Sequence, residues 1–150
     1  MWNLEPNERL REWKRFREHI SQLNIESAVQ ETAHLWSYAP YITRYLDRFN
    51  VTEWPDPWKL LYDNSYCDLA KALGMLYTLY LSDHCGQNFS DLEIKIYKNT
   101  LDNDILNTVW VDDGKYILNF TFDSVVNKDL ITENFIQLCS HSIQTLKHKF

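Results

Sequence analysis

Residues 64–84, NSYCDLAKALGMLYTLYLSDH, form the stretch around which the rest of the chain is arranged. At helical spacing, apolar and small side chains cover two adjoining faces of this stretch. Only one narrow stripe is left to meet water, through Asp68, Lys71, Met75, Thr78 and Ser82. A helix that is apolar on nearly all sides must be wrapped by other elements. We therefore predict one continuous helix over residues 64–84, buried at the centre of the domain.

The ends and the middle of this helix have their own signals. Asn64 and Ser65 are residue types that cap helix N-termini, and Asp68 adds negative charge near the positive end of the helix dipole. Gly74 costs roughly 1 kcal/mol relative to alanine inside a helix. Its presence predicts that another element approaches closely at that point.

Composition favours one folded domain over residues 1–150, with residues 1–57 as a helical and irregular extension of a core at 58–150. Aromatic residues make up 15% of the 150 residues, against only three glycines and four prolines. The net charge of −6 disfavours general binding to nucleic acid or to anionic membranes. Three cysteines, no signal-type apolar segment near Met1 and no apolar run of about 18 residues favour a protein that is not secreted.

The N-terminal third predicts two helices and an aromatic strip. Apolar residues recur every three or four positions over residues 6–20, after a proline suited to a first helical turn. Asn24 is placed to cap a second helix that ends before Pro40. Residues 37–58 hold three of the four prolines and many aromatic rings, which predicts an irregular strip, and residues 58–62 predict a short helix.

After residue 84 the periodicity changes from helical to two. Leu92, Ile94 and Ile96 alternate with polar side chains, which predicts a half-buried strand. Residues 106–111 and 115–122 predict two more strands joined by a tight turn at Asp113-Gly114. The C-terminal segment fits either a helix or a strand, and we favour a strand followed by a short helix. The fold class is therefore α+β: N-terminal helices and a buried central helix packed on a small antiparallel sheet.

A cysteine at the start of a buried helix, followed by an antiparallel sheet, resembles the transglutaminase-like core. Cys67-Asp68-Leu69-Ala70 matches the setting of the nucleophile in that family, and residues 108–119 (TVWVDDGKYILN) match its strand–turn–strand pattern. The resemblance covers residues 58–122. It implies that Thr108 stands in place of the catalytic histidine and Asn119 in place of the aspartate.

A threonine hydroxyl does not take a proton from a thiol near neutral pH. We therefore expect no enzyme activity, no catalytic residue, and Cys67, Thr108 and Asn119 as vestiges of a catalytic set. A cysteine hydrolase or acyltransferase with a displaced base remains the alternative. His141 is then the candidate base, because His84 lies roughly 25 Å from Cys67 along a continuous helix. No cofactor is expected, since paired metal-ligand knuckles and phosphate-binding loops are lacking in the sequence.

The aromatic and acidic character of residues 35–47 and 53–84 also resembles small proteins of contractile-tailed bacteriophages. That resemblance implies a protein-interaction module: a minor structural or assembly component of the virion, in the neck, tail or baseplate. A host-directed binding protein in the host cytoplasm is a further alternative. We expect protein partners, neither nucleic acid nor membrane. We place the interface in the strip and on the outer face of the helix over residues 6–20, with Tyr41, Arg44 and Tyr45 as anchors.

Overall fold

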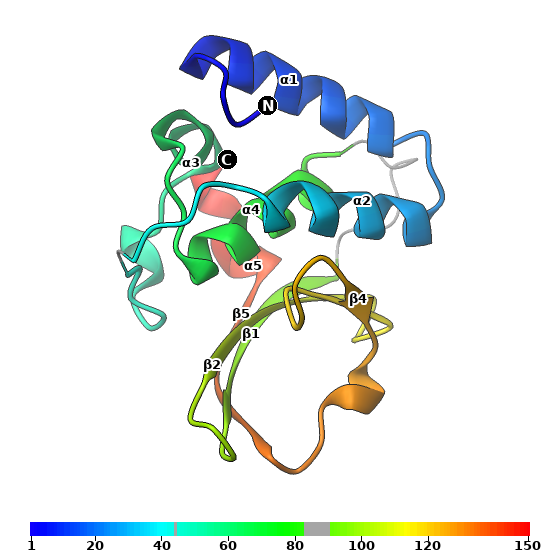
Figure 1. Ribbon diagram of the computed structural model, residues 1–150, viewed down its shortest axis with the longest axis vertical. Helices are drawn as coiled ribbons and strands as arrows, with labels where there is room; N and C mark the ends of the chain where they lie inside the picture. The colour runs from blue at the N-terminus through cyan, green and yellow to red at the C-terminus, as the bar shows by residue number, and fades with distance from the viewer. Residues whose placement is uncertain (44, 83–90) are drawn as a thin grey trace.

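The computed structural model describes residues 1–43, 45–82 and 91–150 and has an α+β architecture (Figure 1). The helices lie together on one side of an antiparallel sheet, and the chain ends beside them. The α-helices are α1 (Pro6–Ile20), α2 (Ile25–Ser37), α3 (Pro57–Asp63), α4 (Asp68–Tyr80) and α5 (Ile143–Leu146). Short 3-10 helices are η1 (Val51–Glu53), η2 (Lys128–Leu130) and η3 (Lys147–Lys149). The predicted fold class is confirmed.

The sheet has five strands in the order β4-β3-β2-β1-β5. The strands are β1 (Leu92–Asn99), β2 (Ile105–Val111), β3 (Tyr116–Leu118), β4 (Val125–Val126) and β5 (Phe135–Ser142). All neighbouring pairs are antiparallel, which confirms the predicted hairpin between β2 and β3. The turn between them places Asp112, Asp113 and Gly114 at positive φ. β3 ends at Leu118, earlier than predicted, because Asn119 adopts a left-handed conformation with φ 63°.

One face of the sheet packs against the helices and the other face is covered by the segment between β3 and β5. Ile94, Ile96 and Val109 belong to the main core, which also contains Trp13 and Trp36 from the N-terminal helices. The opposite face forms a smaller cluster around Tyr97, Trp110 and Ile117, against which Phe120, Ile131 and Phe135 pack. The N-terminal helices therefore share one core with the sheet.

The central helix is shorter than predicted, although its burial is confirmed. Asn64 does not begin α4: it ends α3 in a left-handed conformation with φ 50°, and Cys67 is the N-cap residue of α4. Met75 and Thr78, which we placed on the stripe that meets water, are fully buried. The predicted continuation to His84 lies outside the described residues.

Thr78 joins α4 to both N-terminal helices through its hydroxyl group. The indole N–H groups of Trp13 and Trp36 each donate to Thr78 Oγ1 at 2.9 Å, and this hydroxyl donates to Gly74 O at 2.6 Å. One donor and two acceptor sites are all that a hydroxyl offers, so Thr78 is fully satisfied. The close approach predicted at Gly74 is confirmed, since a Cβ there would lie 2.4 Å from the Trp36 ring.

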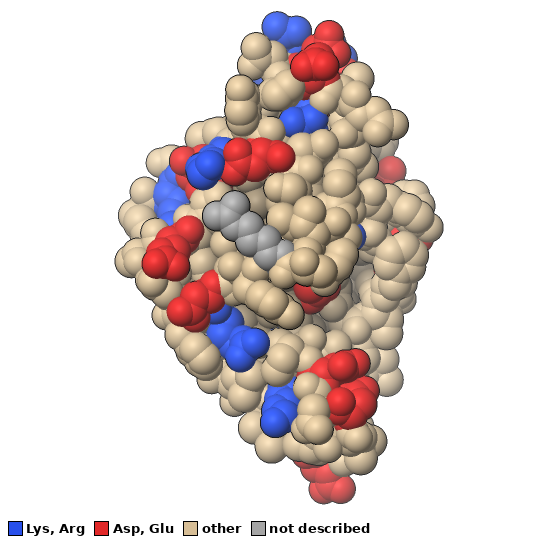
Figure 2. All heavy atoms as spheres, turned by 60° about the vertical axis from the view of Figure 1, so that its left-hand side comes forward, with Lys and Arg blue, Asp and Glu red and all other residues tan. Residues whose placement is uncertain are grey.

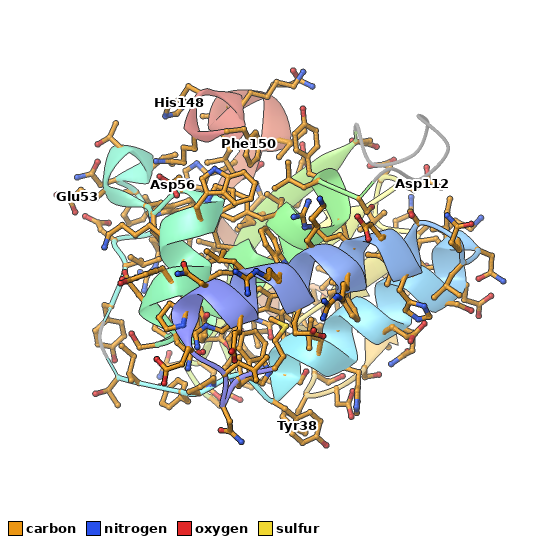
Figure 3. The ribbon with its side chains drawn as sticks, turned by 90° about the horizontal axis from the view of Figure 1, so that it is seen from above. Tyr38, Glu53, Asp56, Asp112, His148 and Phe150 are labelled. Carbon is orange, nitrogen blue, oxygen red and sulfur yellow. The ribbon has the colours of Figure 1, made fainter. Side chains whose placement is uncertain are left out.

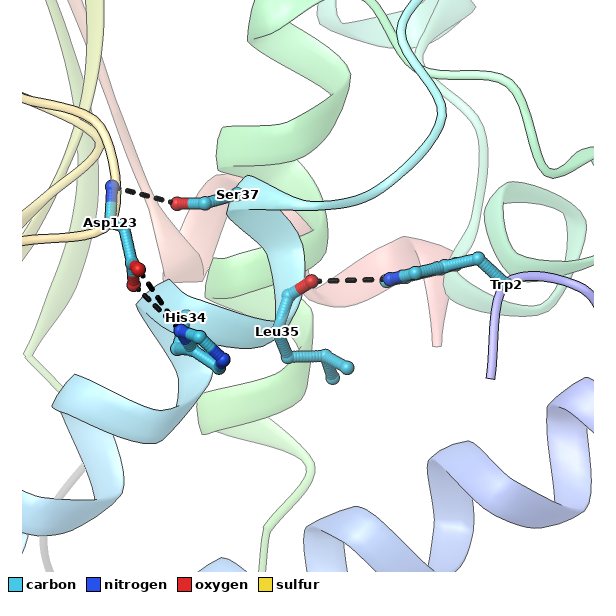
Figure 4. Close-up of polar contacts among 5 residues, drawn as sticks. All are labelled: Trp2, His34, Leu35, Ser37 and Asp123. Atoms are coloured by element: carbon cyan, nitrogen blue, oxygen red, sulfur yellow. Dashed lines mark hydrogen bonds and ion pairs between the residues drawn. The ribbon is translucent and has the colours of Figure 1, made fainter.

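Side-chain bonds fix α1 and α2 to the rest of the molecule. Arg9 is buried and donates to the carbonyl groups of Leu61 and Tyr62, at the end of α3. At the end of α2, His34 bonds the Asp123 carboxylate and Ser37 Oγ accepts from the Asp123 N–H (Figure 4). The helices are thus tied both to one another and to the turn that follows β3.

The other predicted elements agree with the structure. α1 has the predicted bounds, and Asn24 caps α2 by accepting from the Ser27 N–H at 2.8 Å. The short helix predicted at residues 58–62 is α3. The ambiguous C-terminal segment is a strand followed by a short helix, as we favoured.

We expect Thr78→Val to lower the free energy of unfolding by at least about 2 kcal/mol, because it leaves two buried indole N–H donors unpaired at about 1–3 kcal/mol each. The matched control is Thr32→Val, since Thr32 is equally buried but only donates back to Ala28 O. Urea unfolding followed by tryptophan fluorescence measures both variants. Equal losses would show that the Thr78 hydroxyl does not join the helices.

Candidate functional site

Cys67 lies where a bridge between two distant segments meets the start of α4. Tyr41 and Tyr66 form a parallel β-bridge, in which Ile42 N donates to Tyr66 O at 3.1 Å and Tyr66 N donates to Pro40 O at 3.0 Å. This bridge holds the aromatic strip beside the residue that precedes Cys67. Cys67 is 7% exposed and makes no side-chain capping bond. The first N–H groups of α4 lack intrahelical partners, and the Cys67 thiol does not pair with them.

Two cavities meet at Cys67. The first has a volume of about 530 Å³, and its lining includes Tyr41, Tyr45, Arg48, Asp68 and Asn107 as well as Cys67. The second has a volume of about 330 Å³ and lies between the strip, α3 and α4. Both volumes fall in the range of about 300–1,000 Å³ that is usual for ligand pockets. Cys67 therefore borders two spaces, each large enough for part of a bound chain.

A cluster of two asparagines and one aspartate lies next to Cys67. Asn107 Nδ2 donates to Asp68 Oδ2 at 2.8 Å, and Asn119 Nδ2 lies 3.3 Å from Asp68 Oδ1 and donates to Asn107 O at 2.9 Å. Asn107 comes from β2, Asn119 directly follows β3 and Asp68 begins α4. The cluster thus joins two neighbouring strands to the helix that begins after the thiol.

The structure places Thr108 on the face of β2 away from Cys67. Thr108 Oγ1 donates to Lys95 O at 2.7 Å and accepts from Trp110 Nε1, which belongs to the cluster on the far face of the sheet. Asn107, one residue earlier, is the β2 residue that faces the start of α4. The alternation of side chains along a strand gives this result, since a shift of one residue reverses the face. Sequence reasoning found Cys67 and Asn119 but missed Asn107.

His141 is engaged by residues of the aromatic strip. It lies on β5 opposite Ile94, and its Nε2–H donates to Arg48 O at 2.8 Å while its ring packs against Trp54. Cys139 Sγ also lies against Arg48 O, and burial raises the pKa of the Cys139 thiol while Arg48 opposes this effect. Among the described residues that line the two cavities at Cys67, none is histidine.

A partly buried lysine, Lys71, lies near Asp68. Lys71 Nζ donates to Ser37 O at 3.1 Å and lies 5.9 Å from the centre of the Tyr41 ring. Burial lowers the pKa of Lys71, and the nearby Asp68 carboxylate opposes that shift. Lys71 therefore contacts the aromatic strip through Ser37 and Tyr41.

The aromatic strip is exposed at the positions that we predicted as anchors. Tyr41 is 63% exposed and Tyr45 is 87% exposed, while Arg44 lies outside the described residues. The face of the molecule that includes the strip has interspersed acidic and basic side chains with broad uncharged areas between them (Figure 2). Within the described residues, no helix is long and apolar enough to cross a membrane, and no group of three or more acidic, His or Cys side chains is arranged to hold a metal ion.

No protein-family model matches the chain, and no curated protein matches its sequence. The fold, in contrast, is similar to solved structures of Legionella pneumophila LapG, a transglutaminase-like cysteine protease fold. One LapG structure matches with a TM-score of 0.71 and 12% identity, over 91% of this chain and 74% of that one. The calcium-bound LapG structure matches with a TM-score of 0.72 and 12% identity, over 93% of this chain and 77% of that one. The transglutaminase-like core predicted from the sequence is confirmed.

This similarity corrects the expectation that the chain is not an enzyme. The inference depended on placing Thr108 at the position of the base, and Thr108 does not face the site. The fold is instead similar, over 91% of this chain, to that of LapG, a transglutaminase-like cysteine protease fold, and this finding overturns the expectation. The resemblance to phage proteins finds no support in these structures.

We expect Asn107→Asp to destabilise the fold at neutral pH by roughly 1–2 kcal/mol, because two carboxylates would then share one site. One apparent pKa of the pair would rise, and each pKa unit corresponds to about 1.4 kcal/mol. The folded variant would bind more protons than its unfolded chain, so stability relative to the parent returns as the pH falls below the raised value. The control is Asn103→Asp, which adds the same charge in the same cavity without a bond to Asp68. Melting temperatures measured from about pH 4 to pH 8 test this. A similar pH profile for both variants would contradict the geometry of the cluster.

Proposed function

We propose that this chain is a cysteine-dependent hydrolase or acyltransferase that acts on a polypeptide bound across Cys67. The observation that carries the proposal is the position of Cys67, at the N-cap of α4 and on the border of two cavities. Thiols at helix N-termini recur among cysteine nucleophiles. The fold shared with LapG supports the same class of chemistry.

In the proposed reaction the Cys67 sulfur attacks the carbonyl carbon of an acyl group. A C–S bond forms, the C–N or C–O bond to the leaving group breaks, and the leaving group takes a proton from water. A water molecule or an amine then displaces the thiol and releases the acyl group. The negative charge on the carbonyl oxygen is placed to be stabilised by the first N–H groups of α4 and by the dipole of that helix.

The two asparagines have a positioning role in this proposal. Asn107 lines the same cavity as Cys67, and its amide and that of Asn119 hold the Asp68 carboxylate in place. Since no described histidine lines the cavities, the thiol proton is passed to solvent. The rate should then rise with hydroxide concentration, without the bell shape that a cysteine–histidine pair produces.

We expect Cys67→Ser to abolish thiol-dependent cleavage of unfolded casein, while Cys139→Ser leaves it unchanged. Serine is the weaker nucleophile without a base, whereas Cys139 lies against Arg48 O and lines neither cavity. Release of acid-soluble peptides is measured across about pH 6 to pH 9, where the parent rate should rise steadily. Equal activity of the parent and the Cys67→Ser variant, or no activity of the parent on casein or on acyl esters, would refute the proposal.

We propose in addition that the aromatic strip binds the polypeptide partner. Tyr41 and Tyr45 are largely exposed and line the first cavity together with Cys67. Exposed tyrosines next to a reactive group are well suited to hold an extended chain, because they bury much area at low entropic cost. A protein partner, the expectation from sequence, is then bound at the same site as the thiol.

We expect Tyr41→Ala and Tyr45→Ala each to raise the KM for casein by about 30-fold, which is the effect of losing about 2 kcal/mol at an anchor, with little change in kcat. The melting temperature should stay within about 2 °C of the parent, since exposed rings contribute little to the core. Tyr62→Ala is the control, because Tyr62 is 56% exposed but lies on α3 and lines neither cavity. A fall in melting temperature without a change in KM would assign the two rings to the fold instead.

A further inference from the structure

The smaller cavity beside Cys67 has an apolar floor and an acidic rim. Ile42, Leu46, Trp54, Leu60 and Ala70 are the main apolar residues of its lining. The charged residues are Glu53, Asp56 and Asp63 against one cation, Lys59, so the charges of the lining are −3 and +1, a net of −2. Glu53 and Asp56 come from the two ends of the turn that joins η1 to α3, at the edge of the molecule (Figure 3).

The partners of these charges leave the negative rim in place. Lys59 Nζ bonds Asp63 Oδ2 at 2.8 Å, which neutralises one carboxylate. Asp56 Oδ1 accepts the Lys59 N–H as the cap of α3, and a single backbone bond does not remove its charge. Lys149 Nζ lies nearby on Trp54 O, and burial lowers the pKa of Lys149 while Asp56 opposes this shift. With Lys149 counted beside Lys59, the charges around the cavity are −3 and +2, a net of −1, and Glu53 and Asp56 supply its negative character.

We propose that this cavity is a specificity subsite that takes a lysine or arginine side chain of the substrate, next to the acyl group that Cys67 attacks. The assignment rests on the proposed function and names its substrate class. Long basic side chains bury their methylene stems against apolar surface and keep the charged head in a polar rim. The cavity offers both parts, and at about 330 Å³ it has room for one large side chain but little more.

The position of the cavity next to Cys67 determines which side chain of the substrate it binds. Cys67 belongs to the lining of this cavity and of the larger one, so a chain bound at Cys67 has both cavities within reach of its side chains. A carboxylate in a pocket beside a nucleophile selects for a basic side chain in other acyl-transfer enzymes. The same physical relation applies here, with two carboxylates on the rim.

The test uses three peptidyl chloromethyl ketones that differ only in the last side chain: lysine, norleucine or glutamate. Norleucine keeps the aliphatic stem and removes the charge. The rate of alkylation of Cys67 in the full chain is followed by mass spectrometry of the Cys67 peptide. We expect lysine to react at least about tenfold faster than norleucine, which is the effect of one charge-assisted hydrogen bond, with glutamate slowest.

Glu53→Gln combined with Asp56→Asn removes the two carboxylates, while asparagine still caps α3. In this double variant the lysine preference should fall to about one, since the tenfold factor comes from the charges. The charge-matched control is Asp129→Asn combined with Glu133→Gln, on the segment over the other face of the sheet. It should keep the lysine preference. A preference that survives in the double variant, or that is absent from the parent, overturns the subsite.

A second measurement separates this proposal from the catalytic one. In Cys67→Ser, binding of acetyl-Ala-Ala-Lys-amide is compared with that of acetyl-Ala-Ala-norleucine-amide by calorimetry. Tighter lysine binding with slow alkylation of the parent supports the subsite and rejects the catalytic proposal. Rapid alkylation of Cys67 with no lysine preference in either assay rejects the subsite and leaves the catalytic proposal standing.

Discussion

The hydroxyl group of Thr78 is the contact on which the helical layer depends. It receives the indole N–H groups of Trp13 and Trp36, and its own proton goes to Gly74 O. Gly74 lets the Trp36 ring approach the α4 backbone, so the glycine and the hydroxyl both hold α2 against α4, and the hydroxyl also holds α1. A buried donor without a partner costs about 1–3 kcal/mol, and this arrangement leaves none at either tryptophan. The position of α4 against α1 and α2 is thereby fixed.

The fixed position of α4 in turn determines what its N-terminus meets. Cys67 and Asp68 begin the helix against β2 and the end of β3, where Asn107 and Asn119 reach the Asp68 carboxylate. Asn64 ends α3 and Asn119 ends β3, and both residues have a left-handed conformation. Asn64 lies three residues before Cys67, and Asn119 itself contacts Asp68. Asparagine adopts that conformation more readily than most residues because its short amide bonds locally. The packing of the core and the ends of α3 and β3 thus form the site together.

The sequence predicts the elements of this fold better than it predicts the geometry of the site. The periodicity of residues 6–20, the Asn24 cap and the alternation from Leu92 come from local rules, and all three were confirmed. The start of α4 was wrong because Asn64 suits both a helix cap and a left-handed termination, and only tertiary contacts decide between them. Thr108 was wrong as a site residue because strand periodicity does not reveal which of two adjacent polar residues faces the helix.

Placing Asn107 at the site changes the chemistry that the cluster can perform. A histidine beside a thiol exchanges protons, whereas a neutral amide only donates and accepts hydrogen bonds. The amides of Asn107 and Asn119 both point their N–H groups at Asp68, so they hold its charge at the start of α4. Reactivity of Cys67 then depends on the helix N-terminus and on how the two cavities position an acyl group, since orientation alone lowers barriers by several kcal/mol. Under the proposed function, substrate binding in the strip and in the acidic cavity would then be the main source of rate.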